Sequence, residues 1–332
     1  SNRGSHLQLG RRTSRSDCSG KASNPNTSGV FLTTRAQLQK SPLVVVGPTA
    51  CGKSAFALEI ARRVRGVELI SIDSMQVYRK MNIGTAKPTI EEQLEIPHHL
   101  IDIVEPSESF TLVDFQQAHD SVRRDIEERD GVPVLVGGTG LYVRAIVDRL
   151  TPPPRFAQIA SQLDQEHDTE VLHKRLKELD PVGAARMENT NRRRIIRALE
   201  VSIGTGEPFS SFGPGLDSYP DVPYRIIGIE IDRSELDERI RQRYDDQIAA
   251  GFLEEVRSLA ETELSTTAGQ ALGYKELLTH IHGEMSFVDA LDLAIQRTKR
   301  FARRQQRWFK RDPRVEWVTR DQLSTVINEI SS

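Results

Sequence analysis

The stretch Leu43-Val44-Val45-Val46-Gly47-Pro48-Thr49-Ala50-Cys51-Gly52-Lys53-Ser54 decides the fold. Its apolar start predicts a short buried strand, and the apolar and alanine-rich residues 55–61 predict a helix. The residues from Gly47 onward match the pattern G-x-x-x-x-G-K-[ST] of a phosphate-binding P-loop. Because the motif lies between a strand and a helix, we favour a phosphate-binding loop over a chance glycine-rich turn.

The residue types of this loop suit a phosphate ligand. Gly47 and Gly52 let the backbone wrap a phosphate, so that N–H groups and the helix N-terminus point at it. Lys53 supplies a fixed positive charge, and Ser54 supplies a hydroxyl for Mg2+, the expected cofactor. The remaining positions of the binding loop are Pro48, Thr49, Ala50 and Cys51. We expect Cys51 to fill space rather than to act as a redox thiol.

The loop does not specify which phosphate it holds. P-loop proteins that bind ATP or GTP usually place a Mg2+-binding Asp at the end of a later apolar strand. Here the apolar run 132–136 ends in Gly137-Gly138-Thr139-Gly140 instead. Asp73, Glu230 and Asp232 follow other predicted strands and could bind Mg2+ instead. ATP or GTP therefore remains a possible ligand of the loop at this point.

Apolar runs at 68–72, 132–136 and 224–231 predict further strands, and helical patterns separate them. This alternation predicts an α/β fold: a P-loop NTPase-like parallel sheet flanked by helices, with ligands at the carboxyl ends of the strands. Residues 151–222 lack strand signals and predict an all-helical insertion domain. The catalytic core would then comprise residues 41–150 and 223–320, with a long helix at 287–311, after a disordered tail at 1–40.

The composition excludes several classes of protein. The 332 residues carry a formal net charge of -2, so a polyanionic partner must meet local basic patches. The only cysteines, Cys18 and Cys51, exclude a disulfide framework and a cysteine-based zinc module. No apolar run approaches the roughly 20 residues that span a bilayer. We expect a cytoplasmic monomer without membrane contact, although the Arg/Ser-rich tail also suits organellar targeting.

Asp73 directly follows the predicted strand at 68–72, so a parallel sheet would bring its carboxylate to the same edge as the P-loop. There it could act as a general base facing a bound diphosphate. A helix cap with Ser74 beside it explains the residue equally well. Position alone does not decide between the two.

Several ordered motifs together resemble the tRNA dimethylallyltransferase family in its bacterial form. Besides the P-loop, they are Asp73-Ser74-Met75-Gln76-Val77-Tyr78, Ile83-Gly84-Thr85-Ala86-Lys87-Pro88 and Val136-Gly137-Gly138-Thr139-Gly140-Leu141-Tyr142. The resemblance covers residues 41–317, including Asn191-Arg192-Arg193-Arg194 and Gly273-Tyr274-Lys275-Glu276. It implies transfer of the dimethylallyl group from dimethylallyl diphosphate to the N6 amine of the adenine 3′ of the tRNA anticodon, with release of diphosphate.

The resemblance also implies roles for single residues. Asp73 would take the proton from the amine, Thr49 and Lys53 would hold the diphosphate, and Ser54 would help to place Mg2+. Arg243 matches a family arginine that reaches the leaving diphosphate, although its spacing alone favours a solvated helix charge. These residue types suit the chemistry, because an allylic carbon ionises only when charge on the departing diphosphate is stabilised. The channel for the extruded adenine would be lined by Asp73, Ser74, Met75, Gln76 and Thr139.

Basic residues mark the expected contact with the anticodon stem-loop. On the predicted long helix, a stripe recurs at three- and four-residue steps and consists of Arg297, Arg300, Arg304, Arg307 and Arg311, with Lys299, Arg303 and Lys310 beside it. This pattern suits an RNA backbone, with a solvated helix face as the competing account. The resemblance adds Arg193, Arg194, Arg197, Gly273, Tyr274 and Lys275. Pairing with nearby Glu residues is the alternative for the arginines of the insertion.

Rival functions stay open. A P-loop small-molecule or nucleotide kinase would hold ATP-Mg2+ on Lys53 and Ser54 and would use Asp73 to deprotonate a hydroxyl. A free-adenylate isopentenyltransferase shares the P-loop half but leaves the basic stripe without a role. A non-catalytic RNA-binding protein would not depend on Asp73.

Overall fold

The structure is a computed structural model that describes residues 35–213 and 215–331. At its centre, a six-stranded sheet has neighbouring strands that pair in parallel, in the order β3-β2-β4-β1-β5-β6. The predicted α/β fold with a parallel sheet flanked by helices is therefore confirmed. The strands are β1 (Leu43–Val46), β2 (Val67–Ile72), β3 (His98–His99), β4 (Val132–Gly137), β5 (Arg225–Ile229) and β6 (Val315–Val318).

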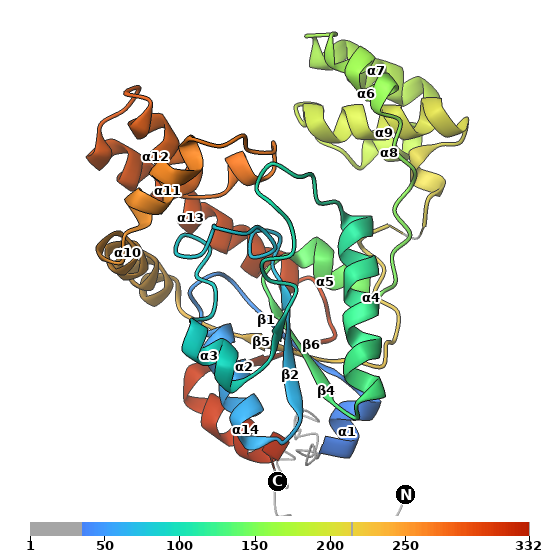
Figure 1. Ribbon diagram of the computed structural model, residues 1–332. Coiled ribbons are helices and arrows are strands. Elements are labelled where there is room, and N and C mark those ends of the chain that lie inside the picture. Colours follow the sequence, from blue (N-terminus) through green and yellow to red (C-terminus); the bar gives the residue numbers. More distant parts are fainter. Residues whose placement is uncertain (1–34, 214, 332) are drawn as a thin grey trace, which may run out of the picture. The chain divides into compact units, whose positions relative to one another are not determined.

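Both faces of the sheet are buried, which explains why its strands read as continuous apolar runs. In β1, Leu43 and Val45 pack in one apolar core, Val44 and Val46 pack in the other, and all are fully buried. In Figure 1, α4 (Leu112–Glu128) lies beside one face, while α2 (Lys53–Arg63) and α14 (Leu323–Ser331) lie beside the other. The face with α4 also receives α5 (Gly140–Val147).

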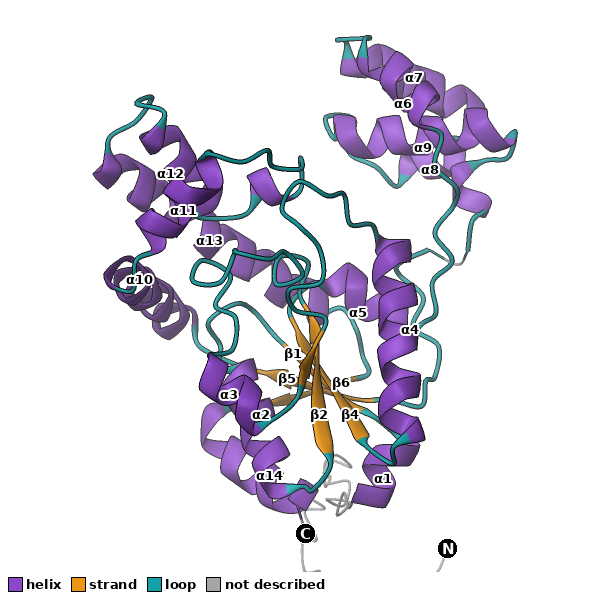
Figure 2. Ribbon diagram, in the orientation of Figure 1, coloured by secondary structure: helices purple, strands orange, loops and turns teal. Residues whose placement is uncertain are grey.

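The C-terminal third supplies most helices of the α2 face, which Figure 2 shows in purple. These are α10 (Arg233–Ala249), α11 (Phe252–Ala260), α12 (Tyr274–Ile281) and α13 (Phe287–Phe309), and the short α3 (Ile90–Glu95) follows β2. The long helix predicted at 287–311 is thus α13, which ends at Phe309. Among residues 35–213 and 215–331, no helix is long and apolar enough to cross a membrane.

Four helices that follow α5 and precede β5 form a core of their own. They are α6 (Ala157–Asp164), α7 (Thr169–Leu179), α8 (Pro181–Ala185) and α9 (Arg192–Thr205). Leu163, Leu172 and Leu199 are among the buried residues that hold them together. The segment that returns from this insertion is fastened by Arg144, whose guanidinium donates to the carbonyls of Leu216 (2.7 Å) and Ser218 (2.6 Å).

The N-terminal boundary differs from the expected one. Residues 35–40 form helix α1 (Arg35–Lys40) instead of belonging to a disordered tail. The physical reason is local: Leu38 is fully buried in the core, and Arg35 pairs with Asp130 at 2.7 Å. The prediction of disorder for residues 1–34, and with it Cys18, lies outside the described residues.

Candidate active site at the carboxyl ends of the strands

The P-loop has the backbone conformation that its glycines predict. Gly47 has φ of 146°, and a Cβ there would lie 2.9 Å from the Sγ atom of Cys51. Gly52, at φ of 103°, precedes the first residue of α2, and Ala50 also adopts positive φ, 64°. Cys51 is fully buried, as its expected space-filling role requires. The loop is therefore closely packed, and the backbone conformation at Gly47 and Gly52 favours glycine at both positions.

The lysine of the loop folds back onto it. The Nζ atom of Lys53 donates a 2.8 Å hydrogen bond to the carbonyl of Pro48. Ser54 lies in the first turn of α2, where backbone N–H groups are free to meet an anion. Lys53 and Ser54 thus stand where an incoming phosphate group would meet both.

Arg243 on α10 reaches the P-loop. Its Nη1 atom donates a 2.7 Å hydrogen bond to the hydroxyl of Thr49. Burial lowers the pKa of the guanidinium, against the opposing effects of Tyr244 and of the charge of Asp73. The Nε atom is buried and has no hydrogen-bond partner among the described residues. Arg243 is therefore not the solvated helix charge that its spacing favours, and one buried N–H remains available to a ligand.

Gln305 on α13 is a site residue that the sequence did not reveal. Its Oε1 atom accepts a 2.8 Å hydrogen bond from the backbone N–H of Thr49, and its Nε2 atom donates one of 2.8 Å to the carbonyl of Gly138. The side chain joins the P-loop to the end of β4. In the sequence, Gln305 is distinguished only as a polar residue at a position of the helix that is buried. That position can be identified as buried only when the packing of the helix is known.

The glycines that end β4 have a packing reason. A Cβ at Gly137 would lie 2.0 Å from the carbonyl oxygen of Ile72, and one at Gly140 would lie 2.2 Å from the indole nitrogen of Trp308. This end of the strand is too crowded for a carboxylate side chain. Between the glycines, the Thr139 hydroxyl accepts a 3.2 Å hydrogen bond from the backbone N–H of Ser74.

Asp73 begins a turn after β2 and does not cap a helix. One oxygen, Oδ1, accepts a 2.8 Å hydrogen bond from the backbone N–H of Met75, whose side chain packs half-buried against the core. The other oxygen has no partner among the described residues. Since β4 lies between β2 and β1, the order along the sheet edge is Asp73, then Thr139, then the P-loop.

Gln76 contacts the protein itself. Its Oε1 atom accepts from the Ser71 hydroxyl at 2.7 Å, and its Nε2 atom donates to the carbonyls of Thr85 (3.2 Å) and Ala86 (3.1 Å). All of these bonds hold the loop that follows β2. The Gln76 side chain therefore shapes the wall beside Asp73, and its expected contact with RNA stays a prediction.

That loop borders a pocket of about 630 Å³. Ile83, Ala86 and Pro88 line it from one side, and Arg243 and Gln247 from α10 line it from the other. Because Arg243 also bonds Thr49, the pocket adjoins the P-loop.

A single carboxylate fastens the same loop. Glu255 on α11 accepts from the backbone N–H groups of Asn82 (2.9 Å), Ile83 (2.9 Å) and Gly84 (3.2 Å), and from the Tyr274 hydroxyl (2.5 Å). Burial and the charge of Glu255 raise the pKa of Tyr274. The Tyr274 side chain is thus buried and bonded to Glu255, and its expected contact with RNA stays a prediction.

The neighbours of Tyr274 are placed differently. Gly273 adopts φ of 86°, and its N–H donates to Glu276 at 2.8 Å, so it forms the tight start of α12. The ammonium of Lys275 donates to the Gln270 side chain at 2.7 Å at the protein surface. Of the three, Lys275 alone presents its side chain near solvent.

The basic stripe on α13 is only partly free. Arg297 pairs with Glu276 at 2.5 Å, Arg303 pairs with Asp237 at 2.8 Å, and Lys310 pairs with Glu230 at 3.0 Å. Within the described part of the chain, no acidic partner contacts the remaining exposed members, which are Arg300, Arg304, Arg307 and Arg311. The stripe is therefore divided into internally paired and unpaired cations.

The arginines of the insertion divide in the same way. Arg197 pairs with the nearly buried Glu200 at 2.8 Å and donates to the carbonyl of Pro153 at 2.6 Å. The pairing with Glu200 is the one that the competing account predicts, and the bond to Pro153 holds the start of the insertion; a contact of Arg197 with RNA stays a prediction. Arg193 and Arg194 are exposed and meet no acidic side chain among residues 35–213 and 215–331.

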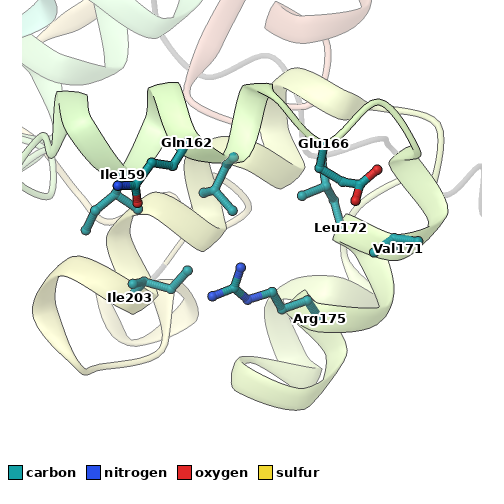
Figure 3. A pocket seen from close by; sticks show the side chains of 8 residues that line it. Ile159, Gln162, Glu166, Val171, Leu172, Arg175 and Ile203 are labelled. Atoms are coloured by element: carbon teal, nitrogen blue, oxygen red, sulfur yellow. The ribbon is translucent and has the colours of Figure 1, made fainter.

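A second, smaller pocket of about 170 Å³ lies between helices of the insertion. Figure 3 shows Arg175 extending into it beside Ile203, with Gln162 and Glu166 at its border. None of its lining residues belongs to the P-loop or to the segment after β2.

Comparisons with known proteins agree with this arrangement. The sequence model of the IPP transferase family matches residues 76–312. The tRNA dimethylallyltransferase of Geobacter metallireducens is 45% identical over 289 residues, which are 84% of this chain and 93% of that protein. The one from Symbiobacterium thermophilum is 46% identical over 286 residues, with 84% and 89% covered.

Solved structures are similar as well. The tRNA isopentenylpyrophosphate transferase of Bacillus halodurans matches with a TM-score of 0.64 and 36% identity, covering 88% of this chain and 96% of that one. A eukaryotic dimethylallyltransferase acting on tRNA matches with a TM-score of 0.72 and 25% identity, covering 84% and 74%. The chain therefore belongs to the tRNA dimethylallyltransferase family of IPP transferases.

Proposed function

We propose that this chain transfers the dimethylallyl group of dimethylallyl diphosphate to the N6 amine of the adenine 3′ of the tRNA anticodon and releases diphosphate. The names of its relatives support the reaction. The observation that carries the proposal is the order of Asp73, Thr139 and the P-loop along one edge of the sheet. A base and a phosphate site at adjacent strand ends suit a transfer between an amine and a diphosphate ester.

The P-loop side would hold the leaving group. As the bond between the allylic carbon and the diphosphate oxygen breaks, the charge that grows on the diphosphate would meet Lys53 and Arg243. The Thr49 hydroxyl accepts from Arg243, so it keeps its own proton to donate to a diphosphate oxygen. This combination stabilises the departing diphosphate more than the intact donor, and that difference lowers the barrier.

The Asp73 side would receive the proton. When the N6 atom bonds the allylic carbon, the amine must lose a proton, and the Asp73 oxygen that is not bonded to Met75 can accept it. The adenine would have to leave its stack to bring N6 to this point. Thr139 and Ser74, already bonded to each other, would border the extruded base.

Ser54 suits a contact with Mg2+. Its hydroxyl has no hydrogen-bond partner among the described residues, and Mg2+ often binds few protein groups together with substrate phosphates and water. Among those residues, no cluster of three or more His, Cys, Asp or Glu could hold a metal ion. When bound, Mg2+ would neutralise charge on the diphosphate.

The unpaired cations would contact the anticodon stem-loop. Arg300 and Arg304 on α13, and Arg193 and Arg194 on α9, have charges that no described acidic side chain neutralises. Such cations release counterions when they meet phosphates, which drives RNA binding. We further propose that the protein is a monomer in the cytoplasm. Sedimentation with and without RNA would test the monomeric state.

The proposal is tested by incubating the protein with labelled dimethylallyl diphosphate, Mg2+ and an anticodon stem-loop. The expected result is label in the RNA. A parallel reaction contains the same components and adds ATP labelled on its terminal phosphate, together with free adenylate as a second acceptor. Phosphate transfer would favour a kinase, and prenylation of adenylate in preference to RNA would favour a free-adenylate enzyme.

A further inference from the structure

The Gln305 amide spans the gap between two strand ends. β1 and β4 are neighbours, with Val46 opposite Gly137, and the P-loop and the glycine turn that follow them start side by side. Gln305 holds one loop through the N–H of Thr49 and the other through the carbonyl of Gly138, each at 2.8 Å. At 7% exposure the side chain is nearly buried; its bond to Gly138 is buried and its bond to Thr49 is partly buried. A buried amide with both ends satisfied fixes the groups that it joins.

Its first consequence concerns Thr49. With its backbone N–H held by Gln305, Thr49 is fixed in orientation, and its hydroxyl meets Nη1 of Arg243 at 2.7 Å. Gln305, Thr49 and Arg243 thus form a connected series that ends at the expected position of the diphosphate. Removing Gln305 would free the loop at Thr49 and loosen the contact that aims Arg243.

Its second consequence concerns α13. The helix approaches the turn after β4 closely, because a Cβ at Gly138 would lie 2.3 Å from Nε2 of Gln305 and one at Gly140 would lie 2.2 Å from Trp308. Arg304, next to Gln305 in sequence, is exposed and has no described acidic partner. One helix therefore carries both the fastening of the P-loop and cations suited to RNA.

We infer that Gln305 is a positioning residue for the transfer reaction: it fixes Thr49, and through it Arg243, against the donor diphosphate. The inference rests on the proposed function, since it names a residue that serves the same site. It assigns Gln305 no contact with substrate.

The test uses Gln305→Met, which keeps length and apolar bulk but removes both hydrogen bonds, and Gln305→Glu, which keeps the acceptor and loses the donor. Gln306→Met is the matched control, because no described residue hydrogen-bonds the Gln306 side chain. Steady-state transfer is measured with dimethylallyl diphosphate and the stem-loop varied separately, and RNA binding and thermal unfolding are measured for each variant.

We expect Gln305→Met to lower kcat about tenfold or more, since two hydrogen bonds that orient a reacting group are lost. RNA affinity should stay within about twofold, because phosphate contacts dominate it. Gln305→Glu should raise KM for the diphosphate donor about tenfold, because it places negative charge beside the P-loop. Gln306→Met should match the parent protein.

The outcomes separate the two proposals. If the parent protein transfers no label, the proposed function fails, whatever the variants do. If the parent is active and both Gln305 variants keep kcat and donor KM within about twofold of Gln306→Met, the inference is overturned. It is also overturned if both variants lose activity only in proportion to folded protein, because Gln305 would then be purely structural.

Discussion

Arg243 donates a 2.7 Å hydrogen bond to the hydroxyl of Thr49, although the two residues lie 194 positions apart in the sequence. The contact brings a guanidinium from α10 onto the loop that follows β1. It converts a charge with an ordinary helical spacing into part of a phosphate site.

Replacing Arg243 should therefore lower turnover. We expect Arg243→Gln to reduce kcat about 100-fold, as losing a cation that stabilises the transition state does elsewhere, and Arg243→Lys to recover part of the loss. The exposed Arg241 on the same helix supplies the control Arg241→Gln, which should leave kcat unchanged. Equal effects of Arg243→Gln and Arg241→Gln on single-turnover rates would contradict the assignment.

Asp73 should be needed for chemistry and not for RNA binding. Asp73→Asn keeps the shape and the acceptor for the Met75 N–H but cannot take a proton, so we expect a loss of about 100-fold or more in kcat. RNA affinity, measured by filter binding, should change little. Asp245→Asn, at an exposed position of α10, is the control. Full activity of Asp73→Asn would remove the proposed base and would agree with a non-catalytic RNA-binding protein.

Much of this arrangement follows from the sequence, and the exceptions have physical causes. The apolar runs that became β1, β2, β4 and β5 are buried on both faces, so they are distinct in the sequence. The edge strand β6 (Val315–Val318) carries the exposed Glu316 and is short, and β3 (His98–His99) has no apolar run at all. Edge strands bury less surface and leave a weaker pattern.

The site shows the same division. The P-loop and Asp73 can be predicted from the sequence, because a local motif identifies the first and the end of a predicted strand identifies the second. Gln305 and Glu255 do not, because each acts through contacts with distant backbone groups: 256 positions separate Gln305 from Thr49, and 173 separate Glu255 from Asn82. The free and the internally paired arginines of α13 are likewise alike in sequence and differ only in what packs beside them.

Glu255 should contribute strongly to stability. Glu255→Ala would leave the N–H groups of Asn82, Ile83 and Gly84 and the Tyr274 hydroxyl without their acceptor, so we expect a loss of about 3 kcal/mol in the free energy of unfolding. Tyr274→Phe removes one of these bonds and should cost about 1 kcal/mol. The exposed neighbour gives the control Glu254→Ala, which should stay within about 0.5 kcal/mol. Urea denaturation measures the free energy of unfolding of all three variants. Equal losses for Glu255→Ala and Glu254→Ala would contradict the stabilising role of Glu255.

The unpaired arginines of α13 should set the salt dependence of RNA binding. Arg300→Ala and Arg304→Ala should each reduce the slope of log K against log salt by about 1, because each removes one phosphate contact. Arg303→Ala is the matched control, since Arg303 already pairs with Asp237 at 2.8 Å. If Arg303→Ala changes the slope as much as Arg304→Ala, the division of the stripe does not determine RNA contact.

Identification of the product nucleoside tests the proposed transfer most directly. The protein is incubated with dimethylallyl diphosphate, Mg2+ and either of two stem-loops, one with adenine 3′ of the anticodon and one with a purine that lacks the exocyclic amine. The RNAs are then digested and analysed by mass spectrometry. We predict N6-dimethylallyl adenosine from the first RNA and no prenylated nucleoside from the second. Equal prenylation of both RNAs, or none in either, would contradict the account.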